Sequence, residues 1–278
     1  MKKHHPTVAA ILATVVITLA ATLAWHRSAD GDIHEVEAFV VKLGGGVARE
    51  PGGDIIAVNL GAMPVTDADM VMVAKLPKMR RLNLAGTKIT DAGIGELAAA
   101  QQLEYLSLAF TGITDEGMRD ISKLGRLHTL LLYGLPITTA SMREINKLER
   151  LQFLAVGSAA ITDAGVNELG SLKLQSLSLA ETSVTGKGFS QLACRESLEA
   201  LNVNGSRFND AGIGELAGFE SLRELWIGST RVTDAGLIAV AKMQSLRMVF
   251  VRNTATTTEG VNRLRQALPA CNIVADER

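Results

Sequence analysis

Aspartates recur at regular intervals along this chain, and their carboxylates are the first candidates for a metal site. A column of stacked carboxylates could hold calcium, which takes roughly six to eight oxygen ligands. Each of these aspartates follows a Thr or an Asn at the start of an expected helix, where a side-chain oxygen can satisfy free backbone amides. No cluster of extra carboxylates accompanies them, so we predict helix capping and no metal ion. The six residues are Asp67, Asp91, Asp115, Asp163, Asp210 and Asp234.

Two glycine-rich stretches imitate a loop that binds the phosphates of a dinucleotide. Residues 93–98 and 212–217 both match the pattern Gly-x-Gly-x-x-Ala. They stand at the same phase of two different repeats, without the strand-to-helix unit and the downstream acidic partner that such a site needs. We therefore assign both stretches to the repeat itself and expect no cofactor.

Other reactive side chains are few and far apart. Beyond the N-terminal region the only histidines are His34 and His128, which lie in different modules. Cys194 and Cys271 are separated by more than three repeats, too far for a disulfide between stacked units, so both are expected to be free thiols. No nucleophile–base pair and no metal cluster can be assigned by spacing, so we predict no catalytic residue, no metal and no enzymatic activity.

The elements that carry these residues repeat every 24 residues. A Leu-x-Leu core or a variant of it is followed seven residues later by an Ile/Val-Thr-Asp phrase or its variant. One interval, from Ile161 to Val184, is 23 residues, and we expect a shortened helix or turn there. A leucine signature at a period of roughly 20 to 29 residues predicts a solenoid of stacked strand–loop–helix units. The cores begin at Val58, Leu82, Leu106, Leu130, Leu154, Leu177, Leu201, Leu225, Val249 and Ile273.

A small hydroxyl residue stands between the strand and the helix of most units. At this position a hydroxyl can bond to the backbone of the turn and keep buried polar groups paired, so we predict a structural role. The column consists of Thr87, Thr111, Thr182, Ser206, Thr230 and Thr254.

The phrase Leu-x-x-Leu-x-Leu-x-x-Thr-x-Ile-Thr-Asp-x-Gly resembles the leucine-rich-repeat family over about residues 55 to 276. It is most similar to the variant with the Ile-Thr-Asp-x-Gly helix start, found in F-box adaptors and in bacterial envelope proteins. The resemblance implies an α/β fold, a right-handed horseshoe with parallel strands on the concave face and short helices on the convex face. It also implies a scaffold that binds rather than catalyses.

Residues 1–27 are expected to be a signal anchor or a cleaved signal peptide. Lys2 and Lys3 precede the uncharged run from Val8 to Trp25, which is long enough to cross a bilayer as a helix. A buried core helix is the remaining alternative. The run predicts that the rest of the chain is membrane-anchored or secreted, on the exported side of the cytoplasmic membrane, and the absence of disulfides favours a bacterial envelope.

The remainder divides into a cap and an array. Residues 28–54 are expected to form a short linker and an N-terminal cap, with a helix that ends at Gly44 and a hairpin around Pro51. Residues 55–278 are expected to form about nine repeat units with a final strand at 271–275. The chain has 28 Lys and Arg against 29 Asp and Glu, so there is no basic face and no nucleic-acid partner is expected.

Side chains that flank the buried leucines are expected to point to the concave face, because strand side chains alternate. Most are small or polar, but two groups are aromatic or large and apolar. Exposed aromatic residues on a concave surface are typical of interface anchors. The alternative is that the aromatic side chains merely cover one another, or that the second group packs under the C-terminal tail. The first group is Tyr105, Leu131, Tyr133 and Phe153; the second is Trp226, Met248 and Phe250.

These observations favour a non-catalytic module that binds a protein or peptide on its concave face and contacts a membrane through its N-terminal helix. A structural envelope protein that self-associates, or that contacts cell-wall glycan, is the second hypothesis. An enzyme is the third.

Overall fold

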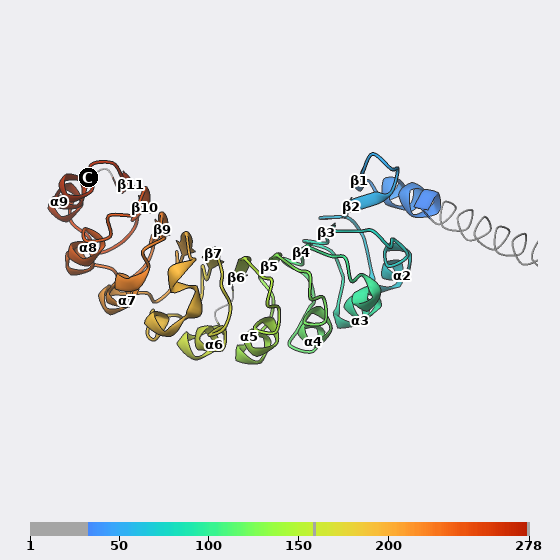
Figure 1. The fold of residues 1–278 in the computed structure, drawn as a ribbon, viewed down its shortest axis with the longest axis horizontal. Coiled ribbons are helices and arrows are strands. Elements are labelled where there is room, and N and C mark those ends of the chain that lie inside the picture. Colours follow the sequence, from blue (N-terminus) through green and yellow to red (C-terminus); the bar gives the residue numbers. More distant parts are fainter. Residues whose placement is uncertain (1–32, 158–159, 277–278) are drawn as a thin grey trace, which may run out of the picture.

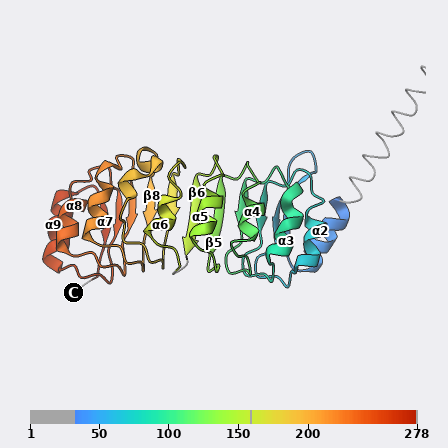
Figure 2. The same cartoon turned by 90° about the horizontal axis from the view of Figure 1, so that it is seen from below.

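The computed structural model of the protein describes residues 33–157 and 160–276. They form an open arc in which one sheet lines the inner side and short helices cover the outer side (Figure 1). Figure 2 shows the helices side by side across the convex face. The predicted α/β horseshoe is therefore confirmed.

One sheet of eleven strands runs through the arc, and its spatial order is the order of the sequence. The pair β1–β2 is antiparallel, as expected for a hairpin cap, and every later pair is parallel. The strands are β1 Gly46–Arg49, β2 Ile55–Asn59, β3 Arg81–Asn83, β4 Tyr105–Ser107, β5 Thr129–Tyr133, β6 Phe153–Gly157, β7 Ser176–Ser178, β8 Ala200–Asn202, β9 Glu224–Trp226, β10 Met248–Phe250 and β11 Asn272–Val274.

The convex side is built from short α-helices and 3-10 turns. Residues 33–42 form a helix ahead of the sheet. The later α-helices are α2 Met70–Val73, α3 Asp91–Glu96, α4 Gly117–Ile121, α5 Thr139–Ile145, α6 Asp163–Asn167, α7 Asp210–Glu215, α8 Asp234–Val240 and α9 Thr258–Ala267. The 3-10 turns are η1 Asp67–Asp69, η2 Leu97–Ala99, η3 Phe189–Gln191, η4 Ala193–Glu196 and η5 Leu216–Gly218. The unit between α6 and α7 therefore crosses the convex face on the 3-10 turns η3 and η4 alone.

The 23-residue interval is absorbed in the turn that follows α6. Leu172 and Leu174 are both buried there with one residue between them, whereas Leu148 and Leu151 of the preceding unit have two. The register of the sheet is kept, because Phe153 still pairs with Ser176.

The leucine columns form one continuous core along the arc. Leu82, Leu106 and Leu130 are fully buried, and each such side chain contributes about 1.5–3 kcal/mol to folding. The predicted hydroxyl column is structural: Thr87 Oγ1, for example, donates to the Leu84 carbonyl at 2.7 Å, and Thr111, Thr182, Ser206, Thr230 and Thr254 make the equivalent bond. All six are buried.

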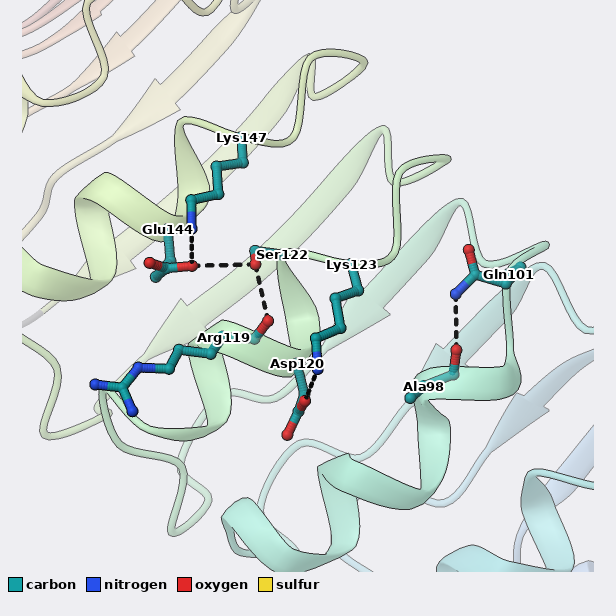
Figure 3. A network of polar contacts seen from close by, with 8 residues as sticks. All are labelled: Ala98, Gln101, Arg119, Asp120, Ser122, Lys123, Glu144 and Lys147. Carbon is teal, nitrogen blue, oxygen red and sulfur yellow. Dashed lines mark hydrogen bonds and ion pairs between the residues drawn. The ribbon is translucent and has the colours of Figure 1, made fainter.

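Neighbouring helices on the convex face are also joined by polar contacts (Figure 3). The Ser122 hydroxyl lies 2.8 Å from the Arg119 carbonyl and 3.1 Å from Glu144 Oε2, which links α4 to α5. Lys147 Nζ lies 2.7 Å from the same carboxylate oxygen and lowers the pKa of Glu144. This face thus carries charged side chains over the middle repeats.

Within the part of the chain that the structure describes, no helix combines the length and the apolar character needed to cross a membrane. The predicted anchor or signal peptide at residues 1–27 lies outside the described residues.

Candidate ligand-binding face

Strand alternation places the predicted residues on the concave side of the sheet. In β4, Tyr105 flanks the buried Leu106, and the parallel register aligns it with Arg81 on β3 and Thr129 on β5. The same row continues to Phe153 on β6. Corresponding side chains of successive repeats therefore stand beside one another, at the strand spacing of about 4.8 Å.

The first predicted group lines one hollow of about 430 Å³, which contains all four of its members, Tyr105, Leu131, Tyr133 and Phe153. Phe153 is 41% exposed, and the other three are half-buried. The guanidinium of Arg81 lies over the Tyr105 ring, 4.6 Å from its centroid, and adds a cation to this apolar wall.

Tyr133 lies along the sheet. Its hydroxyl donates to Ser178 Oγ on β7 at 2.5 Å, and its ring covers the backbone of Gly157, where a Cβ would collide with it. Tyr133 thus forms part of the floor of the hollow. Phe153 is the most exposed side chain of the group and the one most available to a ligand.

A second hollow, of about 560 Å³, adjoins the first and shares Phe153, Ser176 and Ser178 with it. Trp226 on β9 lines it as well, so Trp226 and Phe153 face the same hollow. Charged groups of both signs complete its lining: Glu199, Arg223 and Glu224.

The remaining members of the second predicted group continue the same rows of the sheet. Phe250 pairs with Trp226 and Met248 pairs with Glu224. Both side chains are half-buried, and the Phe250 ring covers the backbone of Gly228. Phe250 therefore resembles Tyr133 in lying flat on a neighbouring repeat. Phe153 and Met248 lie in the row of Tyr105, whereas Trp226 and Phe250 lie in the row of Leu131.

A third hollow, of about 420 Å³, lies at the N-terminal end and shares Arg81 and Tyr105 with the first. Its floor is polar: Asn83 Nδ2 donates to Asn59 Oδ1 at 2.8 Å, which continues the side-chain contacts from repeat to repeat. The three hollows share walls, so the concave face carries a continuous trough from β1 to β9.

The periodic aspartates have a different partner from the one that the sequence predicted. Each binds the Thr that opens the helix of the following repeat, one carboxylate oxygen accepting from the backbone N–H and the other from the hydroxyl. For Asp91 these distances are 2.9 Å to Thr114 N and 2.6 Å to Thr114 Oγ1. The equivalent pairs are Asp67–Thr90, Asp115–Thr138, Asp163–Thr185, Asp210–Thr233 and Asp234–Thr257.

The Gly of the repeated phrase makes room for this contact. A Cβ on Gly93 would collide with the Asp67 carboxylate, and one on Gly117 would collide with that of Asp91. At the same position Ser141 donates its hydroxyl to Asp115. The first glycine of each stretch that imitates a dinucleotide loop, Gly93 or Gly212, is therefore needed for packing between repeats. The six aspartates form what we call the aspartate ladder, a set of bonds between successive repeats.

The aspartate is replaced by Thr139 and Gly186 in two internal units and by Thr258 in the last unit. In the unit after Gly186, helix α7 is capped by its own N-cap residue, because Asn209 Oδ1 accepts from the amides of Ala211 and Gly212. Beside Thr139, an ion pair at 2.8 Å between Arg143 and Glu168 joins α5 to α6.

The comparisons with known proteins agree with this architecture. A family model described as Leucine Rich repeat matches residues 75–98 and 100–122, which are two successive units of the array. The fold is that of a leucine-rich-repeat solenoid. The narrower resemblance, to the variant with the Ile-Thr-Asp-x-Gly helix start, stays a prediction.

Among solved structures, this leucine-rich-repeat chain is similar to internalin C2 from Listeria monocytogenes. The two are 23% identical over 70% of this chain and 80% of that chain, with a TM-score of 0.56, a likeness of fold. A plant peptide hormone receptor, RGFR1 in complex with RGF2, aligns at 14% identity over 74% of this chain and 36% of the receptor chain, with a TM-score of 0.47. No curated protein matches the chain in sequence.

The reactive residues of the leucine-rich-repeat solenoid do not gather. Over residues 33–157 and 160–276, no three His, Cys, Asp or Glu side chains are grouped so that they could hold a metal ion. Cys194 is buried, and burial raises the pKa of its thiol to about 11, which makes it unreactive at neutral pH. Cys194 and the half-exposed Cys271 are both free.

Sequence reasoning missed Phe110, which lies at the edge of this leucine-rich-repeat sheet. It follows β4 by three residues, is 70% exposed and has a φ of 57°. The signal was available in the sequence, because the equivalent positions of the flanking repeats are Gly86 and Gly134, and both also have positive φ.

Proposed function

We propose that the protein is a non-catalytic binding module that holds a protein or peptide in the trough of its concave face. The observation that carries the proposal is Phe153, an exposed aromatic side chain that forms the common wall of two adjoining hollows. Trp226 faces it across the second hollow. Aromatic anchors in a concavity are the usual energetic centre of a protein interface.

The lining of the trough suits a peptide better than a strongly charged ligand. Its apolar members are Leu131, Tyr133 and Phe153, and its charged members are of both signs, with Arg223 beside Glu224. A ligand of mixed composition, with one or more large apolar side chains and few charges, complements this lining.

The proposal includes display outside the cytoplasm, either secreted or anchored in the membrane. Its support is the sequence of residues 1–27, in which two lysines precede an uncharged run.

The test is affinity capture with crosslinking in the native envelope, using the full chain. A double variant, Phe153→Ser with Trp226→Ser, is compared with the parent and with a control, Val71→Ser with Ile238→Ser. The control removes two apolar side chains of comparable exposure, 51% and 61%, from the convex helices α2 and α8.

We expect the parent and the control to recover the same partner and the Phe153/Trp226 variant to lose it. In a purified pair, each anchor should account for at least about 2 kcal/mol, or roughly thirtyfold in affinity. Equal recovery by all three proteins would move the site away from the concave face. Recovery of this chain alone would favour the self-associating structural protein instead.

A further inference from the structure

Phe110 has a conformation and an exposure that the fold does not require. Of the described large apolar side chains, it is the most exposed, at 70%. Its φ of 57° lies in the left-handed region, where a bulky residue is a genuine outlier. Three repeats place Gly at this position: Gly86, Gly134 and Gly205. The repeat thus needs a residue that tolerates positive φ there and has no need of an aromatic ring.

The ring of Phe110 is nevertheless held in place. It lies on the backbone of the next repeat, because a Cβ on Gly134 would collide with it. The Phe110 amide donates to the Tyr133 carbonyl at 2.7 Å, which fixes the loop beside β5. One face of the ring therefore rests on Gly134, and most of its surface is free to meet a partner.

Phe110 lies next to the first hollow, because its amide bonds to the carbonyl of Tyr133, which lines that hollow. Phe153 lies at the start of β6, Leu131 in the middle of β5, Tyr133 at the end of β5, and Phe110 in the loop after β4. These four side chains trace a diagonal across the strands, from one edge of the sheet to the other. Phe110 thus lies at the edge of the sheet at which the strands end.

The loops along this part of the edge carry no charge. Residues 109–112 and 133–137 contain no Asp, Glu, Lys or Arg, whereas the corresponding loops of later repeats carry Glu181, Arg207 and Arg231. An uncharged segment could cross the edge at Phe110 without desolvating an ion, which would be costly. The same path over the later repeats would meet charges of both signs.

We propose that the peptide or protein ligand leaves the trough over this edge and lays an uncharged, extended segment with a large apolar side chain on Phe110. This inference rests on the proposed function, since it extends the same site. It adds a binding residue outside the strands and a direction for the ligand, diagonal to the strands.

The test uses substitutions that separate binding from folding. Phe110→Gly removes the ring and relieves the positive φ, so thermal stability should stay the same or rise by about 2–4 °C. Glu181→Gly is the matched control, because Glu181 has a φ of 59° at the same repeat position and lies at a charged part of the edge. Phe110→Tyr keeps the ring.

The probe is a library of random peptides displayed on phage and selected on the full chain. We expect enriched peptides to carry a large apolar residue in an uncharged stretch. They should bind Phe110→Gly at least about tenfold more weakly than the parent, and bind Phe110→Tyr and Glu181→Gly as the parent does.

Retained binding by Phe110→Gly, combined with loss by Phe153→Ser, would overturn this inference and leave the proposed function standing. A fall in the melting temperature of Phe110→Gly without loss of binding would show that the ring is structural, and would also overturn it. If no peptide is enriched, or if none depends on Phe153 or Phe110, the proposed function fails as well.

Discussion

The hydroxyl of Tyr133 on β5 reaches across β6 and donates to Ser178 Oγ on β7, at 2.5 Å. One side chain thereby spans three strands of a sheet whose backbone hydrogen bonds join only neighbouring strands. The contact keeps the Tyr133 ring flat on Gly157 and leaves Phe153 as the exposed wall of the hollow.

Replacement of Tyr133 by Phe should separate these effects. The ring and the floor of the hollow remain, and one hydrogen bond is lost, so the free energy of unfolding should fall by about 0.5–1.5 kcal/mol. Denaturant unfolding measures the loss. Peptide binding should be almost unchanged, whereas a loss as large as that of Phe153→Ser would mean that Tyr133 itself contacts the ligand.

Two glycines of α3 should respond in opposite directions to replacement by Ala. A Cβ on Gly93 collides with the Asp67 carboxylate, so Gly93→Ala should destabilise by about 1–3 kcal/mol. Two residues later, a Cβ on Gly95 comes no closer than 3.9 Å to Asp120, so Gly95→Ala should stabilise the helix by about 0.5–1 kcal/mol. Thermal unfolding of the two variants checks the pair, and the same sign for both would contradict the packing role assigned to Gly93.

The aspartate ladder can be extended where it is interrupted. Thr139 stands at the aspartate position, and the next repeat supplies both Thr162, to donate to a carboxylate, and Gly165, to make room for it. Thr139→Asp should therefore add two charge-assisted hydrogen bonds and raise the free energy of unfolding by about 1–2 kcal/mol. Gly186→Asp is the contrasting variant, because Gly186 has a φ of 92° and the following unit caps itself through Asn209; it should destabilise. A loss of stability in Thr139→Asp would contradict this account.

The ladder also predicts how stability depends on pH. Desolvation by burial opposes ionisation of Asp115, but hydrogen bonds from Ser141 and Thr138 outweigh it and lower the pKa. The hydrogen bonds from Thr257 lower the pKa of Asp234. A carboxylate whose folded-state pKa is depressed stabilises the fold above its unfolded pKa, near 4, and loses that contribution as the pH falls through the folded value.

Stability should therefore decrease as the pH is lowered from about 5 toward 3, and the decrease should be shallower in an Asp115→Asn, Asp234→Asn variant. Urea unfolding at several pH values measures both slopes. Identical slopes for the parent and the variant would show that these two aspartates do not contribute.

The fold could be predicted from the sequence because each unit repeats the same physical pattern. Leu106 and Leu108 alternate with Ser107, and Thr111 follows at a fixed distance, so a strand and its turn are specified locally and again in the next unit. The interval that lacks a residue could be placed only in a helix or its turn, because Leu172 and Leu174 both fit the apolar pattern of the repeat. In the structure both are buried.

The partner of a side chain in another repeat could be predicted much less well. Asp91 was expected to cap its own helix, but its carboxylate is aimed along the axis of the arc at Thr114, a direction that a pattern within one unit does not contain. Trp226 was grouped with Phe250, with which it pairs across β9 and β10, but the hollow that it shares with Phe153 could not be predicted from the strand columns. Phe110 lies in a loop outside the strand columns, so strand alternation could not predict its exposure.

The aspartate ladder has a consequence for how such a chain can change in length. Thr114 receives a carboxylate from the unit before it, Gly117 leaves the space for that carboxylate, and Asp115 offers the same group to the unit after it. Every unit that carries Thr, Asp and Gly in this order can bind the carboxylate of the unit before it and offer an equivalent carboxylate to the unit after it. A whole unit of 24 residues could therefore be duplicated or deleted within residues 67–138. The two units that become neighbours would form the same aspartate–threonine contact.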